Sequence, residues 1–269
     1  MNCRDVDRSL MGHDKSVAAQ LPAQVQEHLL ACDRCRKLVR ALDSSVGADE
    51  PSPEILRQLE QTLATESRPV RPLAPARYFF AAIAAIFVLI VAASVYRLGA
   101  FAISVMSPVQ SITILCALAA SAGLLAYSLV HQMAPGSPHR FPPKLLPVAV
   151  VGLLAIVMAG LFQFQHEGDF WSSGWACLRV GSPIGFVAAV PFWLLLRQGA
   201  ILSPRVTGAA AGLLAGLVGT TALEIHCPIL DASHILTWHL SVAILGAVIG
   251  LAAGFASEAA ERHLRSAPR

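Results

Sequence analysis

The sequence predicts an all-α protein in which a small polar head of short helices precedes a bundle of six long apolar helices. Of its 269 residues, 55% are hydrophobic and only 14% are charged, against about 25% charged residues in an average soluble domain. The charges are also uneven, because residues 1–77 hold 22 of the 37 charged side chains. These observations exclude a disordered chain and favour a membrane protein over a simple soluble globule.

The head, residues 1–45, carries a pattern of metal-ligand type. Residues 28–35 read HLLACDRC, which is H-x3-C-x2-C. Two cysteines separated by two residues can chelate one ion, and His28 lies one helical turn before Cys32 on the same face. Cys3 offers a fourth soft ligand, and His13 competes with it for that place. Three thiolates and one imidazole are typical of a closed structural zinc site.

The sequence therefore predicts a zinc-stabilised helical head in which the ion supplies much of the folding energy. The proposed Zn²⁺ ligands are Cys3, His28, Cys32 and Cys35. Two other interpretations of the cysteine pair are ordinary core thiols and a thioredoxin-like C-x-x-C. The second requires a nearby βαβ pattern, which the sequence lacks.

Residues 46–77 predict an amphipathic helix followed by a proline-rich tether. Ser52-Pro53-Glu54 is a typical helix start. An apolar stripe at helical spacing follows, made of Ile55, Leu56, Leu59 and Leu63. This stripe either contacts a partner protein or packs on the core of the head itself. Residues 67–77 contain three prolines and form a stiff basic tether.

Residues 78–256 contain six apolar runs close to the roughly 20 residues that span a bilayer. Small residues recur in the second and fifth runs, which supports a packed bundle or a homodimer contact. Residues 257–269 form a tail. The six expected spans are 78–96, 109–130, 145–165, 180–196, 206–223 and 238–256.

The placement of Lys and Arg predicts the orientation of the bundle, because positive residues are retained in the cytoplasm. With the N-terminus inside, ten basic residues fall on inner segments, and only Arg97 and Arg179 fall on outer loops. An even number of spans also places the C-terminus inside. We therefore expect a multi-pass membrane protein with both termini in the cytoplasm.

The head resembles the zinc-finger domain of bacterial anti-sigma factors. The likeness rests on Cys3, Leu21-Pro22 and the H-x3-C-x2-C-R run from His28 to Arg36. It covers residues 1–45 and, loosely, 53–66. The resemblance implies that His28, Cys32, Cys35 and an upstream Cys or His hold zinc. It also implies that the head sequesters an extracytoplasmic-function sigma factor, with a further helix wrapping around that partner.

The membrane segment is similar to the six-span negative regulator of sigma F family. The likeness covers roughly residues 78–256. The segments that carry it are 174–178 (GWACL), 196–200 (LRQGA), 208–213 (GAAAGL), 226–228 (HCP) and 238–239 (WH). Both resemblances imply the same regulatory role.

The outer face of the bundle is a candidate sensor. On the expected topology, Cys177 and Cys227 lie in the third and fifth loops, where the periplasm favours disulfides. They either form a structural disulfide, stay reduced and react, or bind a transition metal with neighbouring His226 and His234. His166, His239 and four nearby acidic residues, Glu167, Asp169, Glu224 and Asp231, are further loop groups at this face.

Together these patterns predict a membrane-anchored anti-sigma factor that releases its sigma factor on a periplasmic redox or metal stress signal. The small net charge of +3 argues against direct nucleic-acid binding. No catalytic motif is present, so we expect no enzyme activity. Two alternatives stay open: a membrane transporter or channel with a zinc-binding regulatory head, and a metal-dependent membrane enzyme. The near absence of acidic residues within spans disfavours the transporter.

Overall fold

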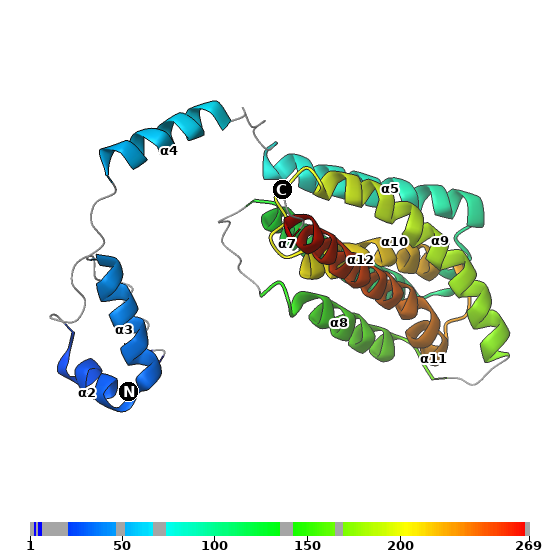
Figure 1. Cartoon of the computed structure of the whole chain (residues 1–269). Helices are drawn as coiled ribbons and strands as arrows, with labels where there is room; N and C mark the ends of the chain where they lie inside the picture. Colours follow the sequence, from blue (N-terminus) through cyan, green and yellow to red (C-terminus); the bar gives the residue numbers. More distant parts are fainter. Residues whose placement is uncertain are drawn as a thin grey trace. The chain divides into compact units, whose positions relative to one another are not determined.

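The computed structural model describes residues 3, 5–6, 21–46, 52–66, 74–134, 142–164 and 169–266 (Figure 1). Two compact units divide the chain, residues 1–71 and 72–269. Within the described ranges the secondary structure is helical, and the only β feature is an isolated bridge between Gln163 and Asp231. The all-α prediction is confirmed.

The helices bounded in the described part of the first unit are α2 (Ala23–Ala31), α3 (Asp33–Val46) and α4 (Pro53–Glu66). Pro22 precedes α2 as its N-cap, consistent with the fixed φ angle of proline at helix starts. The core of this unit is small: Val6, Leu21, Val25, Cys35 and Val39 are buried together. A core of this size leaves much of the unit's stability to other interactions.

Helix α4 begins where the sequence predicts, because the Ser52 hydroxyl accepts a hydrogen bond from the backbone N–H of Ile55 at 3.3 Å. Its apolar stripe is not covered by the described parts of the chain. The exposed fractions of Ile55, Leu56, Leu59 and Leu63 are 57%, 44%, 54% and 60%. Among the described residues, the stripe does not pack on the core of the head.

The second unit is a helical bundle (Figure 1). Its elements are α5 (Ala76–Leu98), α6 (Phe101–Val105), α7 (Pro108–Gln132), α8 (Leu146–Leu161), α9 (Phe170–Leu196), α10 (Pro204–His226), α11 (Ala232–His234), a π-helical turn (Ile235–His239) and α12 (Leu240–Ser266). Five segments are long and apolar enough to cross a membrane: α5, α7, α9, α10 and the segment 232–260.

The third expected span, 145–165, forms α8, an apolar helix of 16 residues. At 1.5 Å per residue it is about 24 Å long, which is shorter than the ~30 Å hydrocarbon core. It packs against α7 and α12 within the bundle. The bundle therefore contains six apolar helices of unequal length.

The fourth expected span starts ten residues earlier than predicted, at Phe170 rather than Val180. Asp169 caps this helix by accepting a hydrogen bond from the backbone N–H of Ser172. Pro183 and Pro191 both lie inside the continuous helix. Consequently Arg179, expected in an outer loop, lies within α9.

Helix α10 is the central element, with most of its apolar window buried by α5, α7, α9 and α12. Its glycines pack directly on those of α12. A Cβ atom placed on Gly212 would lie 2.0 Å from the carbonyl oxygen of Gly246, and one on Gly208 would lie 2.2 Å from that of Gly250. The small residues of the fifth span therefore allow close packing within this chain.

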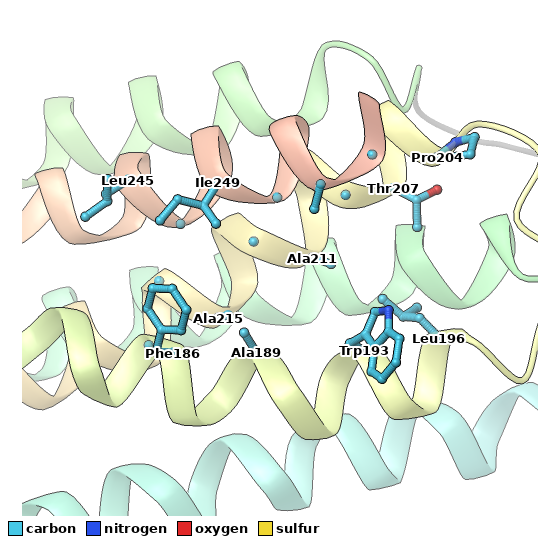
Figure 2. A pocket seen from close by; sticks show the side chains of 18 of the residues that line it. Phe186, Ala189, Trp193, Leu196, Pro204, Thr207, Ala211, Ala215, Leu245 and Ile249 are labelled. Carbon is cyan, nitrogen blue, oxygen red and sulfur yellow. The ribbon is translucent and has the colours of Figure 1, made fainter. Parts of the chain in front are cut away.

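An apolar groove of about 380 Å³ lies between α9, α10 and α12 (Figure 2). Small side chains of α10, such as Ala211 and Ala215, form its floor. Larger side chains, including Phe186, Trp193 and Ile249, line its walls. A groove of this composition matches the hydrocarbon environment of a membrane protein.

Candidate metal centres

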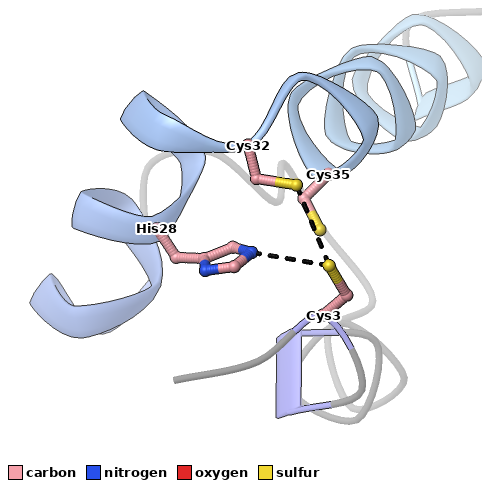
Figure 3. Close-up of side chains that lie close together, drawn as sticks. All are labelled: Cys3, His28, Cys32 and Cys35. Carbon is pink, nitrogen blue, oxygen red and sulfur yellow. Dashed lines mark hydrogen bonds between the residues drawn. The ribbon is translucent and has the colours of Figure 1, made fainter.

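The four head residues singled out in the sequence lie together (Figure 3). The Sγ atom of Cys3 is 3.8 Å from Nε2 of His28 and 3.8 Å from Sγ of Cys32. All four ligand atoms, including Sγ of Cys35, lie within 4.8 Å of one another. Tetrahedral zinc with Zn–S of about 2.3 Å and Zn–N of about 2.05 Å requires S···S near 3.8 Å and S···N near 3.6 Å. The donor set and its spacing fit this ion.

The break between α2 and α3 positions three of these donors. Cys32 has an extended backbone (φ −115°, ψ 109°), and its N–H donates to the carbonyl of His28. This residue ends α2, so His28 projects from the last turn of one helix and Cys35 from the first turn of the next (Figure 3). Cys3 approaches from the N-terminal segment. The prediction that these four residues form one cluster is confirmed.

The two cysteines of the C-x2-C pair differ in acidity. A hydrogen bond from the backbone of Cys35 lowers the pKa of Cys32 to about 7. Burial, with hydrogen bonds from the other two thiols, raises the pKa of Cys35 to about 12. A bound cation would deprotonate both, because metal coordination favours the thiolate strongly.

A second cluster lies in the bundle and contains Cys177, Cys227, His234 and His239. The Sγ atoms of Cys177 and Cys227 are 3.5 Å apart, and Nε2 of His234 lies 3.4 Å and 3.8 Å from them. All four residues are buried. The sequence prediction is right that three of these residues meet, but the surroundings differ: Cys177 lies within α9, and Cys227 directly follows α10, rather than both lying in surface loops.

His226, the other predicted member of the outer site, is not part of this cluster. Its Nδ1 atom lies 3.3 Å from the carbonyl oxygen of Gly99, and its ring contacts Phe101. Asp231 caps α11 by accepting from the backbone N–H of His234. His166 and Glu167 lie outside the described residues.

Two residues were expected at this face but not assigned to the sensor site: His239, which is a member of the cluster, and Glu224, which contacts it. His239 is five residues after His234, which on an α-helix places the two side chains about 140° apart. The residues between them form a π-helical turn, in which the N–H of Leu240 bonds to the carbonyl of Ile235. Bonding from i to i+5 widens the turn and returns His239 to the face of His234. The Nδ1 atom of His239 is 2.9 Å from Oε1 of Glu224, and both side chains are fully buried.

Two comparisons with known proteins point to the same family. A family model described as negative regulator of sigma F matches residues 63–256. The chain is 29% identical over 135 residues to "Probable anti-sigma-F factor NrsF" of Azospira oryzae, which covers 48% of this chain and 62% of that protein. The alignment thus spans less than two thirds of the relative. No solved structure matches the chain. Because the family match covers well over half of the sequence and includes the whole Cys177–His239 cluster, the chain belongs to the negative regulator of sigma F family.

Proposed function

We propose that the protein is a membrane-anchored anti-sigma factor that holds an extracytoplasmic-function sigma factor inactive in the cytoplasm. The observation that carries the proposal is the combination of a membrane segment of this family with an N-terminal Cys₃His cluster of zinc-site geometry. The printed name of the relative, a probable anti-sigma-F factor, agrees with it.

In this proposal zinc bound by Cys3, His28, Cys32 and Cys35 holds α2 and α3 at the angle needed for binding. The ion would cross-link the two helices, which the five buried side chains of the small core alone hold together only weakly. No step in sequestration requires catalysis by these residues. Loss of zinc, by chelation or by oxidation of the thiols, would melt the head and release the partner.

The exposed stripe of α4 is the proposed second contact with the sigma factor. Ile55, Leu56, Leu59 and Leu63 form one apolar face on a helix whose other face is polar and charged. An amphipathic helix of this kind binds by laying its apolar face into a groove of the partner.

The bundle is the proposed anchor and sensor in a bacterial inner membrane, with both termini in the cytoplasm. The excess of basic residues on the expected inner segments supports this orientation. The outer cluster would receive the signal. Oxidation of Cys177 and Cys227 by a peroxide would form one S–S bond; two thiol protons and two electrons would pass to the peroxide, which is reduced to two water molecules or, for an organic hydroperoxide, to one alcohol and one water. Capture of a thiophilic metal ion is the other route.

The decisive experiment is co-purification of the full chain in detergent with candidate sigma factors. We expect one sigma factor to be retained, and to be lost after treatment with a zinc chelator. Leu59→Glu should abolish retention, whereas Gln61→Glu, which adds the same charge on the opposite face of α4, should not. Failure to retain any small sigma factor, in wild-type protein with zinc bound, would overturn the proposal. Solute flux in proteoliposomes would instead support a transporter.

A further inference from the structure

We propose that Cys177, Cys227, His234 and His239 form a second, resident site for a soft divalent cation such as Zn²⁺, and that Glu224 is the positioning residue that holds His239 toward the ion. The site is the one assigned above to the sensor, so its regulatory meaning depends on the proposed function. Cation binding itself does not depend on that function and can be measured separately.

The distances favour a metal site over a disulfide. A disulfide requires sulfur atoms about 2.05 Å apart, whereas the two sulfurs here are 3.5 Å apart. Tetrahedral zinc geometry requires about 3.8 Å between sulfurs and about 3.6 Å between sulfur and nitrogen. The measured S···N distances are 3.4 Å and 3.8 Å. The cluster therefore has almost the same dimensions as the head cluster.

Buried polar atoms without partners mark the same place. Nε2 of His239, Nδ1 of His234 and Oε2 of Glu224 are buried and have no hydrogen-bond partner among the described residues. A buried polar atom without a partner is unfavourable, so three of them around one cluster need a physical reason. A cation bound by Nε2 of His239 removes one of them directly and provides positive charge near the Glu224 carboxylate.

Glu224 explains how His239 presents the correct atom. A carboxylate that accepts a hydrogen bond from Nδ1–H fixes the tautomer in which Nε2 carries the free lone pair. The Oε1–Nδ1 distance of 2.9 Å is that of such a bond. An acidic side chain is expensive inside a membrane segment and ordinarily has a functional partner there. Glu224 is also the acid of α10, the most buried helix of the bundle.

The donor set selects the class of ion. Two thiolates and two imidazoles favour Zn²⁺ or Cd²⁺ over the oxygen-seeking Mg²⁺ and Ca²⁺. Four protein donors leave no open coordination position, so the site is structural or regulatory and not catalytic. Binding of the ion converts two thiols to thiolates and releases their two protons. The ion then joins α9, the end of α10 and the π-helical turn that precedes α12.

The first test measures metal content of the full chain in detergent by elemental mass spectrometry. The expected content is two ions per chain for wild type, one for the Cys32→Ser/Cys35→Ser head variant, and one for Cys177→Ser/Cys227→Ser. Cys116→Ser, a change at an exposed cysteine outside both clusters, should retain two. A head variant that binds no ion, or a Cys177→Ser/Cys227→Ser variant that keeps the wild-type content, would overturn the proposal.

The second test needs no cysteine change in the outer site and so does not depend on how such variants fold. In the head variant, Cd²⁺ should produce a thiolate-to-metal absorption band, and Glu224→Gln should weaken Cd²⁺ binding by about 10–100-fold in competition with a chelator. His226→Gln, a change at the neighbouring histidine outside the cluster, should leave the affinity unchanged. Equal affinities for Glu224→Gln and its parent would refute the role of Glu224. Loss of sigma-factor binding with normal metal content would refute only the proposed function.

Discussion

The close packing of α10 on α12 makes a quantitative prediction about one glycine. In Gly212→Ala the new methyl carbon would lie 2.0 Å from the carbonyl oxygen of Gly246 and 3.1 Å from Cα of Gly250. Ordinary contact between such atoms begins at 3.4 Å. The helices must therefore separate by more than 1 Å at this point, and the separation also loosens the neighbouring glycine contact at Gly208.

The expected cost of this separation is about 1–3 kcal/mol, the usual range for overpacking a tight core. Gly152→Ala is the matched control, because a Cβ atom at Gly152 meets no atom within 4 Å. There the substitution only restricts the unfolded chain and should stabilise the helix by about 0.5–1 kcal/mol. The two variants carry the same chemical change with effects of opposite sign.

Unfolding of the purified protein by SDS in mixed micelles, followed by circular dichroism, measures both changes. Gly212→Ala should unfold at a lower SDS fraction than wild type, and Gly152→Ala at an equal or higher one. If the two variants shift the transition equally and in the same direction, glycine packing between α10 and α12 is not what holds these helices together.

Three further predictions concern the head and the inner end of the bundle. In metal-free protein, the rate of Cys32 alkylation should rise as the pH increases through about 7, the pKa of this thiol. Cys35, whose pKa is raised to about 12, should stay unmodified at pH 8. Peptide mass spectrometry measures both alkylation rates, and equal rates would contradict this difference in acidity. Removal of zinc by a chelator should unfold the head, because zinc contributes about 10–16 kcal/mol to the folding of small zinc domains. The circular dichroism signal should then fall by at most the helical content of the 23 residues of α2 and α3. A larger loss would show that helices outside the head also depend on the metal. Glu258→Gln breaks a 2.7 Å ion pair with Arg205 that is partly open to solvent. The free energy of unfolding in the SDS titration should therefore fall by at most about 1 kcal/mol. A decrease as large as that of Gly212→Ala would show that this ion pair contributes strongly to stability.

The sequence predicted the head cluster well because its chemistry is local. His28, Cys32 and Cys35 lie within eight residues, so helical spacing alone brings three donors together. The start of α4 was equally accessible, since Ser52 carries its own capping signal. The long apolar runs identified helices because membrane length and composition set a strong constraint.

The remaining features depend on contacts that a linear pattern does not contain. Hydropathy placed the start of α9 at Val180, because the segment from Ser172 to Gly174 is only weakly apolar; the cap at Asp169 sets the actual start. His239 was expected near this site without being assigned to it, and an α-helical register would point it away from His234. A single π-helical turn changes that register, and sequence spacing gives no indication of it.

Helix α10 provides the physical route by which an event at the Cys177–His239 cluster could act on the opposite end of the bundle. Glu224 lies at one end of this helix, and at the other end the Thr207 hydroxyl donates to the side chain of Gln132 on α7. Between them the glycine contacts with α12 leave no room for gradual deformation, because added atoms or small shifts meet backbone. Under the proposed function, oxidation of the two thiols or a change in ion occupancy at this cluster would therefore move α10 and α12 together, as in rigid-body switching. A Thr207→Val variant that uncouples the inner end should leave metal affinity at the outer cluster unchanged while altering the signal dependence of sigma-factor release, whereas equal release by variant and wild type would exclude this route.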